Sequence, residues 1–179
     1  MEYRLLSNPE HIRNLFIKEF VESYESFSIH HEEWIAGLHT EFSREYYDKM
    51  FMWDRKLQSA RNISFVDALT VLKNKTGEVL FLTESSQCPV KEFCKLNNKE
   101  QFVATASAKE LAECISYEWF TEYELCEKDC YLSDPILPSE VYVFDDSFTW
   151  CLIFTHETDE TETADSRFCL YIDKTAPNQ

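Results

Sequence analysis

The stretch VYVFDDSFTWCLIFTH, residues 141–156, decides the fold of this chain. Side chains alternate in character from Val141 to Phe144, and this period of two predicts a strand. The polar cluster Asp145–Ser147 predicts a turn. Residues 149–156 then predict a second strand, and residues 168–172 predict a third. The C-terminal part of the chain is therefore expected to form a β-meander.

Helical patterns precede this meander. Apolar residues recur every three or four positions from Asn8 to about Ser26 and from Ser107 to about Glu127, which predicts two helices. We expect Ser107 to cap the second of them together with Glu110. An S-x-x-D pattern that begins at Ser64 predicts a further short helix, ending near Lys73.

The remaining segments complete the expected fold. Residues 78–84, EVLFLTE, are rich in β-formers and predict a strand buried in the middle of a sheet. Within residues 31–57, the run Tyr46 to Asp54 fits either a buried strand or a helix end, and we expect a helix followed by a short strand. The sequence thus predicts an α+β fold over a single globular domain, residues 1–179. In it, N-terminal and central helices pack on a mainly antiparallel sheet that ends in the β-meander.

Charge is the most unusual feature of the composition. The chain has 33 acidic and 17 basic residues, which gives a formal net charge of -16 on 179 residues. Proteins that bind nucleic acids or anionic membranes gain affinity from Lys and Arg, so this balance argues against both partners. It favours a basic protein partner instead. Aromatic residues make up 15% of the chain, enough to build a core and to argue against disorder.

Cysteine number and the N-terminal sequence predict a reducing, cytoplasmic environment. The seven cysteines are odd in number and irregularly spaced, so we expect free thiols. The first residues lack the basic and apolar segments of a signal peptide, and no run approaches the roughly 18 apolar residues of a membrane span. Cys126 and Cys130 are four residues apart and could bind zinc with a histidine, but zinc sites have tighter paired spacings. We therefore expect no metal site and no cofactor.

Three segments carry a resemblance to known proteins. The segment PSEVYVFDDSFTWCLIFTHE, Pro138 to Glu157, resembles the closing hairpin of small acidic bacterial domains of uncharacterised function, with the pattern VYV-x-D-x-x-F-x-W followed by THE. The stretches within Phe51 to Ser85 and Glu118 to Leu125 are similar to the same group. Some similar proteins are immunity partners of secreted toxins. The resemblance implies a bacterial, cytoplasmic protein with this fold, and it implies no specific chemistry.

Candidate catalytic residues lie at the end of the second predicted meander strand. His156 and Glu157 could form a general base or a metal ligand, because imidazole titrates near neutral pH and a carboxylate can orient it. The alternative is a structural strand end with a solvated glutamate. An enzyme would need further groups in the same cleft, such as His39 or Asp145. With two glycines in the chain, the glycine-rich nucleotide loops and the G-x-S-x-G elbow are excluded.

Other clusters of histidine and acidic residues give weaker indications of a functional site. The run His30 to Glu33 alternates its side chains between different sides of a helix or strand, so only part of it could bind one ion. Asp145 and Asp146 are better explained as turn formers than as an acid and base pair. Glu118 and Glu122 fit a solvated helix face.

Two function classes follow from these observations. The first is an acidic interaction protein, in one form an immunity-type inhibitor, that binds a basic partner. Its candidate binding residues lie in and near the acidic loop from Glu157 to Asp165: Glu157, Asp159, Glu160, Glu162 and Trp150. Trp150, like Trp53 and Trp119, could instead be a core residue. The second class is a small enzyme with a His/Glu site, and a subunit of a larger complex is a third possibility.

Overall fold

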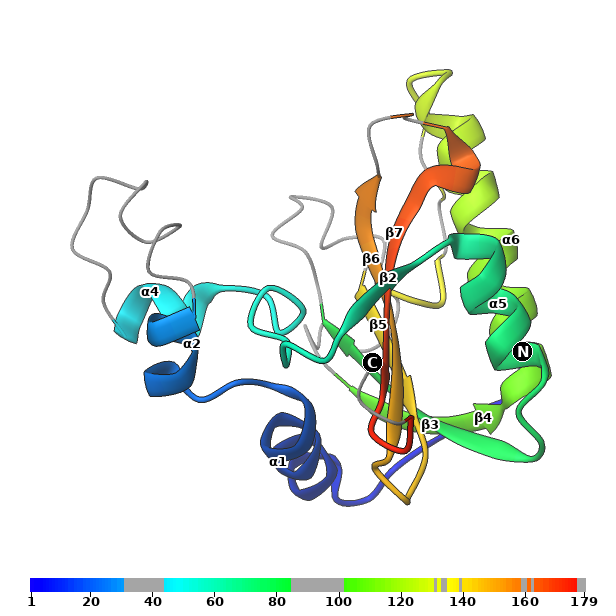
Figure 1. The fold of residues 1–179 in the computed structure, drawn as a ribbon. Coiled ribbons are helices and arrows are strands. Elements are labelled where there is room, and N and C mark those ends of the chain that lie inside the picture. The colour runs from blue at the N-terminus through cyan, green and yellow to red at the C-terminus, as the bar shows by residue number, and fades with distance from the viewer. Residues whose placement is uncertain are drawn as a thin grey trace.

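A seven-stranded antiparallel sheet lies at the centre of the molecule, with helices on both of its faces (Figure 1). The computed structural model describes residues 1–30, 44–84, 102–130, 132, 135–138, 140–158, 161 and 163–176. This architecture confirms the expected α+β fold with its mainly antiparallel sheet.

The strands run in the order β1-β4-β3-β5-β6-β7-β2, and every described pair is antiparallel. The last three strands along the chain are neighbours, so the predicted β-meander is confirmed. Residues 78–84 form β3 between β4 and β5, which confirms a buried central strand. The strand bounds are β1 Tyr3–Leu5, β2 Arg61–Ile63, β3 Glu78–Glu84, β4 Val103–Ser107, β5 Glu140–Phe144, β6 Trp150–Thr158 and β7 Arg167–Asp173.

Two helices, α5 (Phe65–Lys73) and α6 (Ala108–Cys126), cover one face of the sheet. The Ser64 side chain accepts a hydrogen bond from the Asp67 backbone N–H at 3.0 Å, so the predicted cap of α5 is confirmed. The core beneath these helices is apolar and contains Phe65, Leu72, Phe81, Leu111, Ile115, Leu152 and Phe154.

The other face is covered by α1 (Pro9–Phe20), with α2 (Tyr24–His30) and α4 (Arg44–Lys49) beside it. Pro9 and the Asn8 side chain, which accepts a hydrogen bond from His11 N–H, fix the start of α1. The core on this side contains Phe16, Phe20, Met52, Tyr142, Phe144, Ile153, Leu170 and Ile172. A short 3-10 helix, η1 (Ala164–Ser166), precedes β7.

Three local predictions are wrong in detail. The helix expected from Asn8 to Ser26 ends at Phe20, where Val21 becomes extended and bridges to Lys56. No strand forms in the described residues of the run 46–54: α4 ends at Lys49 and turns follow it. A short apolar run fits a strand and a helix end equally well, which explains this error.

The cap of α6 is the third difference. Ser107 occupies the cap position but its side chain makes no capping hydrogen bond. Glu110 instead accepts a hydrogen bond from the Glu2 backbone N–H at 3.1 Å, so its carboxylate joins α6 to the first strand rather than to its own helix end. The short edge strands β1 and β2 and the alanine-rich β4 were not predicted from the sequence.

Within the described residues, no helix combines the length and the apolarity that crossing a membrane requires.

Candidate functional sites

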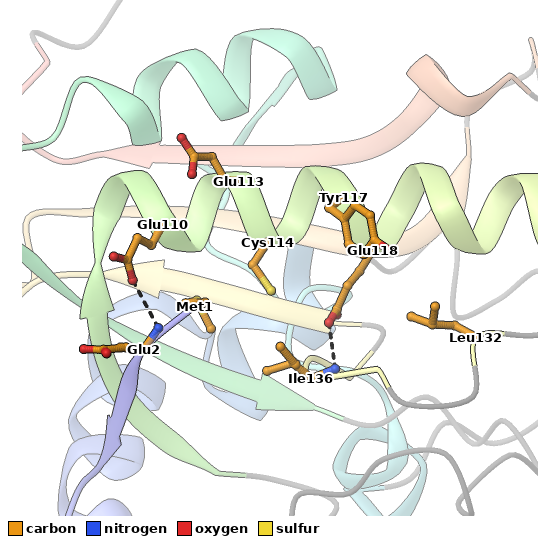
Figure 2. A pocket seen from close by; sticks show the side chains of 9 residues that line it. All are labelled: Met1, Glu2, Glu110, Glu113, Cys114, Tyr117, Glu118, Leu132 and Ile136. Atoms are coloured by element: carbon orange, nitrogen blue, oxygen red, sulfur yellow. Dashed lines mark hydrogen bonds between the residues drawn. The ribbon is translucent and has the colours of Figure 1, made fainter.

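The first candidate site is a pocket of about 680 Å³ beside the N-terminal half of α6 (Figure 2). Five of its lining residues come from α6 and lie at positions spaced three and four apart, which places them on one side of the helix. The others come from the start of the chain and from the connection before β5. The lining residues are Met1, Glu2, Glu110, Glu113, Cys114, Tyr117, Glu118, Leu132 and Ile136.

Carboxylates dominate this α6 pocket. Glu2, Glu110, Glu113 and Glu118 line it, and none of the described lining residues is a lysine or arginine. Glu110 and Glu118 point from α6 toward Glu2 and Ile136 (Figure 2). The Met1 α-amino group, whose charge acts on Cys114, is the one cation among the described lining residues, so the pocket keeps a net negative charge that attracts cations and repels anions.

Glu118 has a structural task within the pocket. Its carboxylate accepts hydrogen bonds from the backbone N–H groups of Ile136 at 2.7 Å and Leu137 at 3.0 Å. Glu122 similarly accepts one from Leu132 N–H at 3.1 Å. The expectation that these two glutamates form only a solvated face is therefore wrong, because they hold the connection before β5 against α6. Burial raises the pKa of Glu118 despite these hydrogen bonds.

Tyr117 is an exposed aromatic residue in this acidic setting. It is 67% exposed, among the highest values for large apolar or aromatic side chains in the described residues. Tyrosine supplies large contact area at low entropic cost and is enriched among the residues that dominate binding interfaces. Glu113, one helical turn away, is exposed and has no hydrogen-bond or ion-pair partner among the described residues. The pocket thus combines an aromatic anchor with uncommitted negative charge.

The second candidate site surrounds His156 on the other face of the sheet. Its Nδ1 lies within hydrogen-bond distance of Glu140 Oε1, and its Nε2 lies 3.2 Å from Glu157 Oε1. The structure therefore brings His156 and Glu157 together. The hydrogen bond to Glu140 is the main reason why the pKa of His156 is raised, and it outweighs the opposing effect of burial.

An irregularity in β6 places His156 there. The register between β6 and β7 shifts between Phe154 and Thr158. Phe154 belongs to the core under α5 and α6, so regular alternation would put His156 on that face as well. Its ring lies instead near the rings of Phe51 and Trp53, and Trp53 packs against the core on the α1 side. Such bulges often redirect a side chain next to a functional site.

Two further carboxylates complete this cluster, and the sequence analysis missed both. Glu140 is fully buried at the start of β5, and Asp54 lies in the turn segment after α4. Burial raises the pKa of Asp54, and the charges of Glu157 and Glu140 add to this effect, while those of Lys56 and His156 oppose it. Neither residue has a sequence signal, because only the pairing of β5 with β6 and the packing of residues 51–54 bring them to His156.

The other predicted binding residues have different positions. Asp159, Glu160 and Glu162 lie outside the described residues, as does His39. Trp150 is 5% exposed and belongs to the core under α5 and α6, with its indole N–H donating to Asp145 Oδ2 at 2.5 Å. Asp145 also accepts a hydrogen bond from Ser147 N–H, as a turn former does, and the structure does not bring it to His156.

Candidate metal ligands and cysteines also occur in the described part of the chain. No group of three or more His, Cys, Asp or Glu side chains there could hold a metal ion. His30 pairs with Glu22 at 3.3 Å, whereas residues 31–33 of the same motif lie outside the described part. Five cysteines among the described residues carry thiols rather than disulfides: Cys114, Cys126, Cys130, Cys151 and Cys169.

Comparison with protein-family models, with curated proteins and with solved structures gives no match for this chain, so its own geometry has to carry the functional assignment.

Proposed function

We propose that this protein is an acidic, cytoplasmic interaction protein that binds a basic protein partner through the α6 pocket. The observation that carries the proposal is the lining of this pocket. Four glutamates line it, no lysine or arginine is among the described lining residues, and Tyr117 is exposed on the same helix. A lysine or arginine of the partner would insert into the pocket while its surroundings pack on Tyr117.

Charge supports the proposal at longer range. A net charge of -16 creates a field that accelerates the encounter with a basic protein and slows encounters with acidic ones. The 3-10 helix η1, which follows the acidic segment, packs on α6, and Trp119 Nε1 donates to Ala164 O at 2.8 Å. Asp165 in η1 is exposed. The loop residues Asp159, Glu160 and Glu162 remain proposed contributors to this binding surface, whereas Glu157 contacts His156 on the opposite face of the sheet.

An immunity-type inhibitor is one form of this function. Nucleases carry basic surfaces because they hold phosphates, so an acidic protein can cover such a surface by charge complementarity. The resemblance of the 138–157 hairpin to domains that include toxin-immunity proteins is consistent with this form.

The test uses three tagged proteins as baits in a lysate of the native cells, at low and at high salt. The first is the wild type, and the second carries Glu110→Gln, Glu113→Gln and Tyr117→Ala. The third is a matched control with Glu10→Gln and Asp48→Asn, which removes two exposed carboxylates on the opposite side of the sheet. Glutamine at 110 keeps an oxygen that can accept from Glu2 N–H, and Glu118 is left intact because it holds the fold.

We expect the wild type and the control to retain the same basic protein at low salt and to lose it at high salt. The α6 variant should lose it at both. Equal retention by all three baits would contradict the assignment of the α6 pocket. The absence of any basic partner would contradict the function itself.

A further inference from the structure

We infer that Glu140 and His156, with Asp54, form a proton-transfer site for a small ligand with a planar aromatic part. This activity goes beyond partner binding and lies on the opposite face of the sheet from the α6 pocket. The failure of either proposal leaves the other standing.

The burial of the Glu140 carboxylate is the first feature that supports this inference. It is 0% exposed, its Oε1 faces His156 Nδ1, and its Oε2 has no hydrogen-bond partner among the described residues. Glu84, 8% exposed, stands directly opposite it in the register of β3 and β5. Two buried carboxylates facing each other across strands oppose folding, and apolar residues of similar size would avoid that cost. A functional task explains why such groups are present.

The imidazole is held in one orientation by this carboxylate. With Nδ1 directed at Glu140, the proton that can be exchanged with a ligand is the one on Nε2. The Glu157 carboxylate that faces Nε2 is 53% exposed, and exposed ion pairs of this kind contribute little free energy. A ligand can therefore displace Glu157 and reach His156, whose own side chain is 35% exposed.

Aromatic rings define the ligand class. Phe51 and Trp53 lie nearly parallel, with 11° between their planes, and their centroids lie 5.5 and 6.5 Å from that of His156. These surfaces suit a flat, apolar group. Trp53 Nε1 is a buried donor without a hydrogen-bond partner among the described residues, which is rare for a buried polar group.

Charged groups around His156 come from several elements. Glu140 lies on β5, Glu157 on β6 itself, Asp54 in the segment after α4, and Arg167 on β7. The carboxylates favour the imidazolium form, whereas Arg167 opposes it. In the proposed step, His156 Nε2 accepts a proton from the ligand, and Asp54 is a further carboxyl group whose charge interacts with that of His156. Glu140 acts as a positioning residue, since it orients the imidazole without touching the ligand.

The probe is 5-nitrobenzisoxazole, a flat aromatic compound that opens when a base removes its C3 proton. The electrons of the C–H bond form the nitrile, the N–O bond breaks, and 2-cyano-4-nitrophenolate is released and measured by absorbance. The base keeps the proton and returns it to water. No oxidant, metal or cofactor takes part.

Four proteins are compared across pH: the wild type, His156→Gln, Glu140→Gln and the control His11→Gln, whose side chain is exposed on α1. We expect saturable turnover by the wild type that rises with pH as His156 loses its proton, and a loss of about 100-fold or more in His156→Gln. Glu140→Gln should move the midpoint of the pH profile to lower pH. His11→Gln should match the wild type.

A wild-type rate equal to that of free imidazole at the same concentration would overturn the inference. So would full activity in His156→Gln. If His156→Gln does not fold, Glu140→Gln decides through its pH profile, because an unchanged midpoint would remove Glu140 from its positioning task.

Discussion

The two faces of the sheet differ in how they treat charge. Under α5 and α6 the core is apolar, and its one buried cation among the described residues, Arg167, lies 4.3 Å from the ring centroid of Trp119 and donates to Thr155 O at 2.6 Å. On the α1 face, Glu22, Glu84 and Glu140 are buried, each with 8% exposure or less. Among the described residues, the buried carboxylates therefore lie on the α1 face, whereas the acidic residues of α6 are exposed or half-buried.

Because of this difference, we expect the two faces to contribute differently to stability and to function. Apolar burial without unpaired charge stabilises a fold, so we expect the α6 side to act as the rigid support on which an external binding surface is built. Buried carboxylates cost free energy and shift pKa values, so we expect the α1 side to respond to pH and to carry proton chemistry.

The largest effect on stability is expected from truncating a buried side chain in the apolar core under α5 and α6. Phe65 is fully buried and packs against Phe120 and Phe154, so Phe65→Ala should lower the free energy of unfolding by about 3–5 kcal/mol. Val66 on the same helix is 55% exposed, and Val66→Ala should change it by less than about 0.5 kcal/mol. Urea denaturation measures both. Equal losses of unfolding free energy in the two variants would show that Phe65 does not contribute to the core on this face.

A smaller effect is expected for the glutamate that holds the connection before β5. Glu118→Ala leaves the N–H groups of Ile136 and Leu137 without their acceptor, which should cost about 1–3 kcal/mol. Glu113→Ala on the same helix should have almost no effect on unfolding. If Glu118→Ala is as stable as Glu113→Ala, both residues belong to the binding surface alone.

The pH dependence of stability tests the α1 face. Burial raises the pKa of Glu84 and of Asp54, and the Glu140 hydrogen bond raises that of His156. A raised pKa means that the folded state binds more protons than the unfolded state. Stability should therefore fall as pH rises, from about 3.8 for Asp54, from about 4.5 for Glu84 and from about 6.5 for His156.

The matched variant for this pH test is Glu84→Gln. It should flatten the lower part of the stability profile and leave the part above about pH 6.5 unchanged. Thermal unfolding at a series of pH values measures this. A wild-type stability that rises steadily between pH 5 and 8 would contradict the account of buried carboxylates on this face.

The smallest effect concerns thiol reactivity and leaves the fold intact. Burial raises the pKa of Cys114 and of Cys169 to about 12, whereas Cys126 and Cys130 are exposed. Iodoacetamide at pH 8 should therefore label Cys126 and Cys130 first, since the thiolate is the reactive form. Peptide mass spectrometry identifies the labelled positions. Rapid labelling of Cys114 would show that the floor of the α6 pocket opens in solution.

Sequence patterns predicted the elements whose signals are local. Alternation gave the β5–β6 hairpin, the S-x-x-D motif gave the start of α5, and helical spacing gave α6. Short edge strands such as β1 and β2 were missed because three residues carry no usable period.

The candidate sites were harder to predict, because they depend on contacts between distant segments. His156 and Glu157 were identified as neighbours in the chain, yet the buried partner Glu140 is 16 positions away and reaches His156 through strand pairing. The α6 pocket was not predicted. Its glutamates resemble any solvated helix face until the start of the chain and residues 132–136 close around them.

The most direct test of the account is an NMR titration with a defined basic probe. The ¹⁵N-labelled protein is titrated with acetylated penta-arginine amide and, as a neutral control of similar shape, with the penta-citrulline peptide. The account predicts saturable shifts centred on Glu110 to Glu118 and on Ile136, found with arginine, absent with citrulline, and lost in the Glu110→Gln, Glu113→Gln, Tyr117→Ala variant. Shifts spread evenly over acidic residues on both faces, or centred on the α1 side, would contradict it.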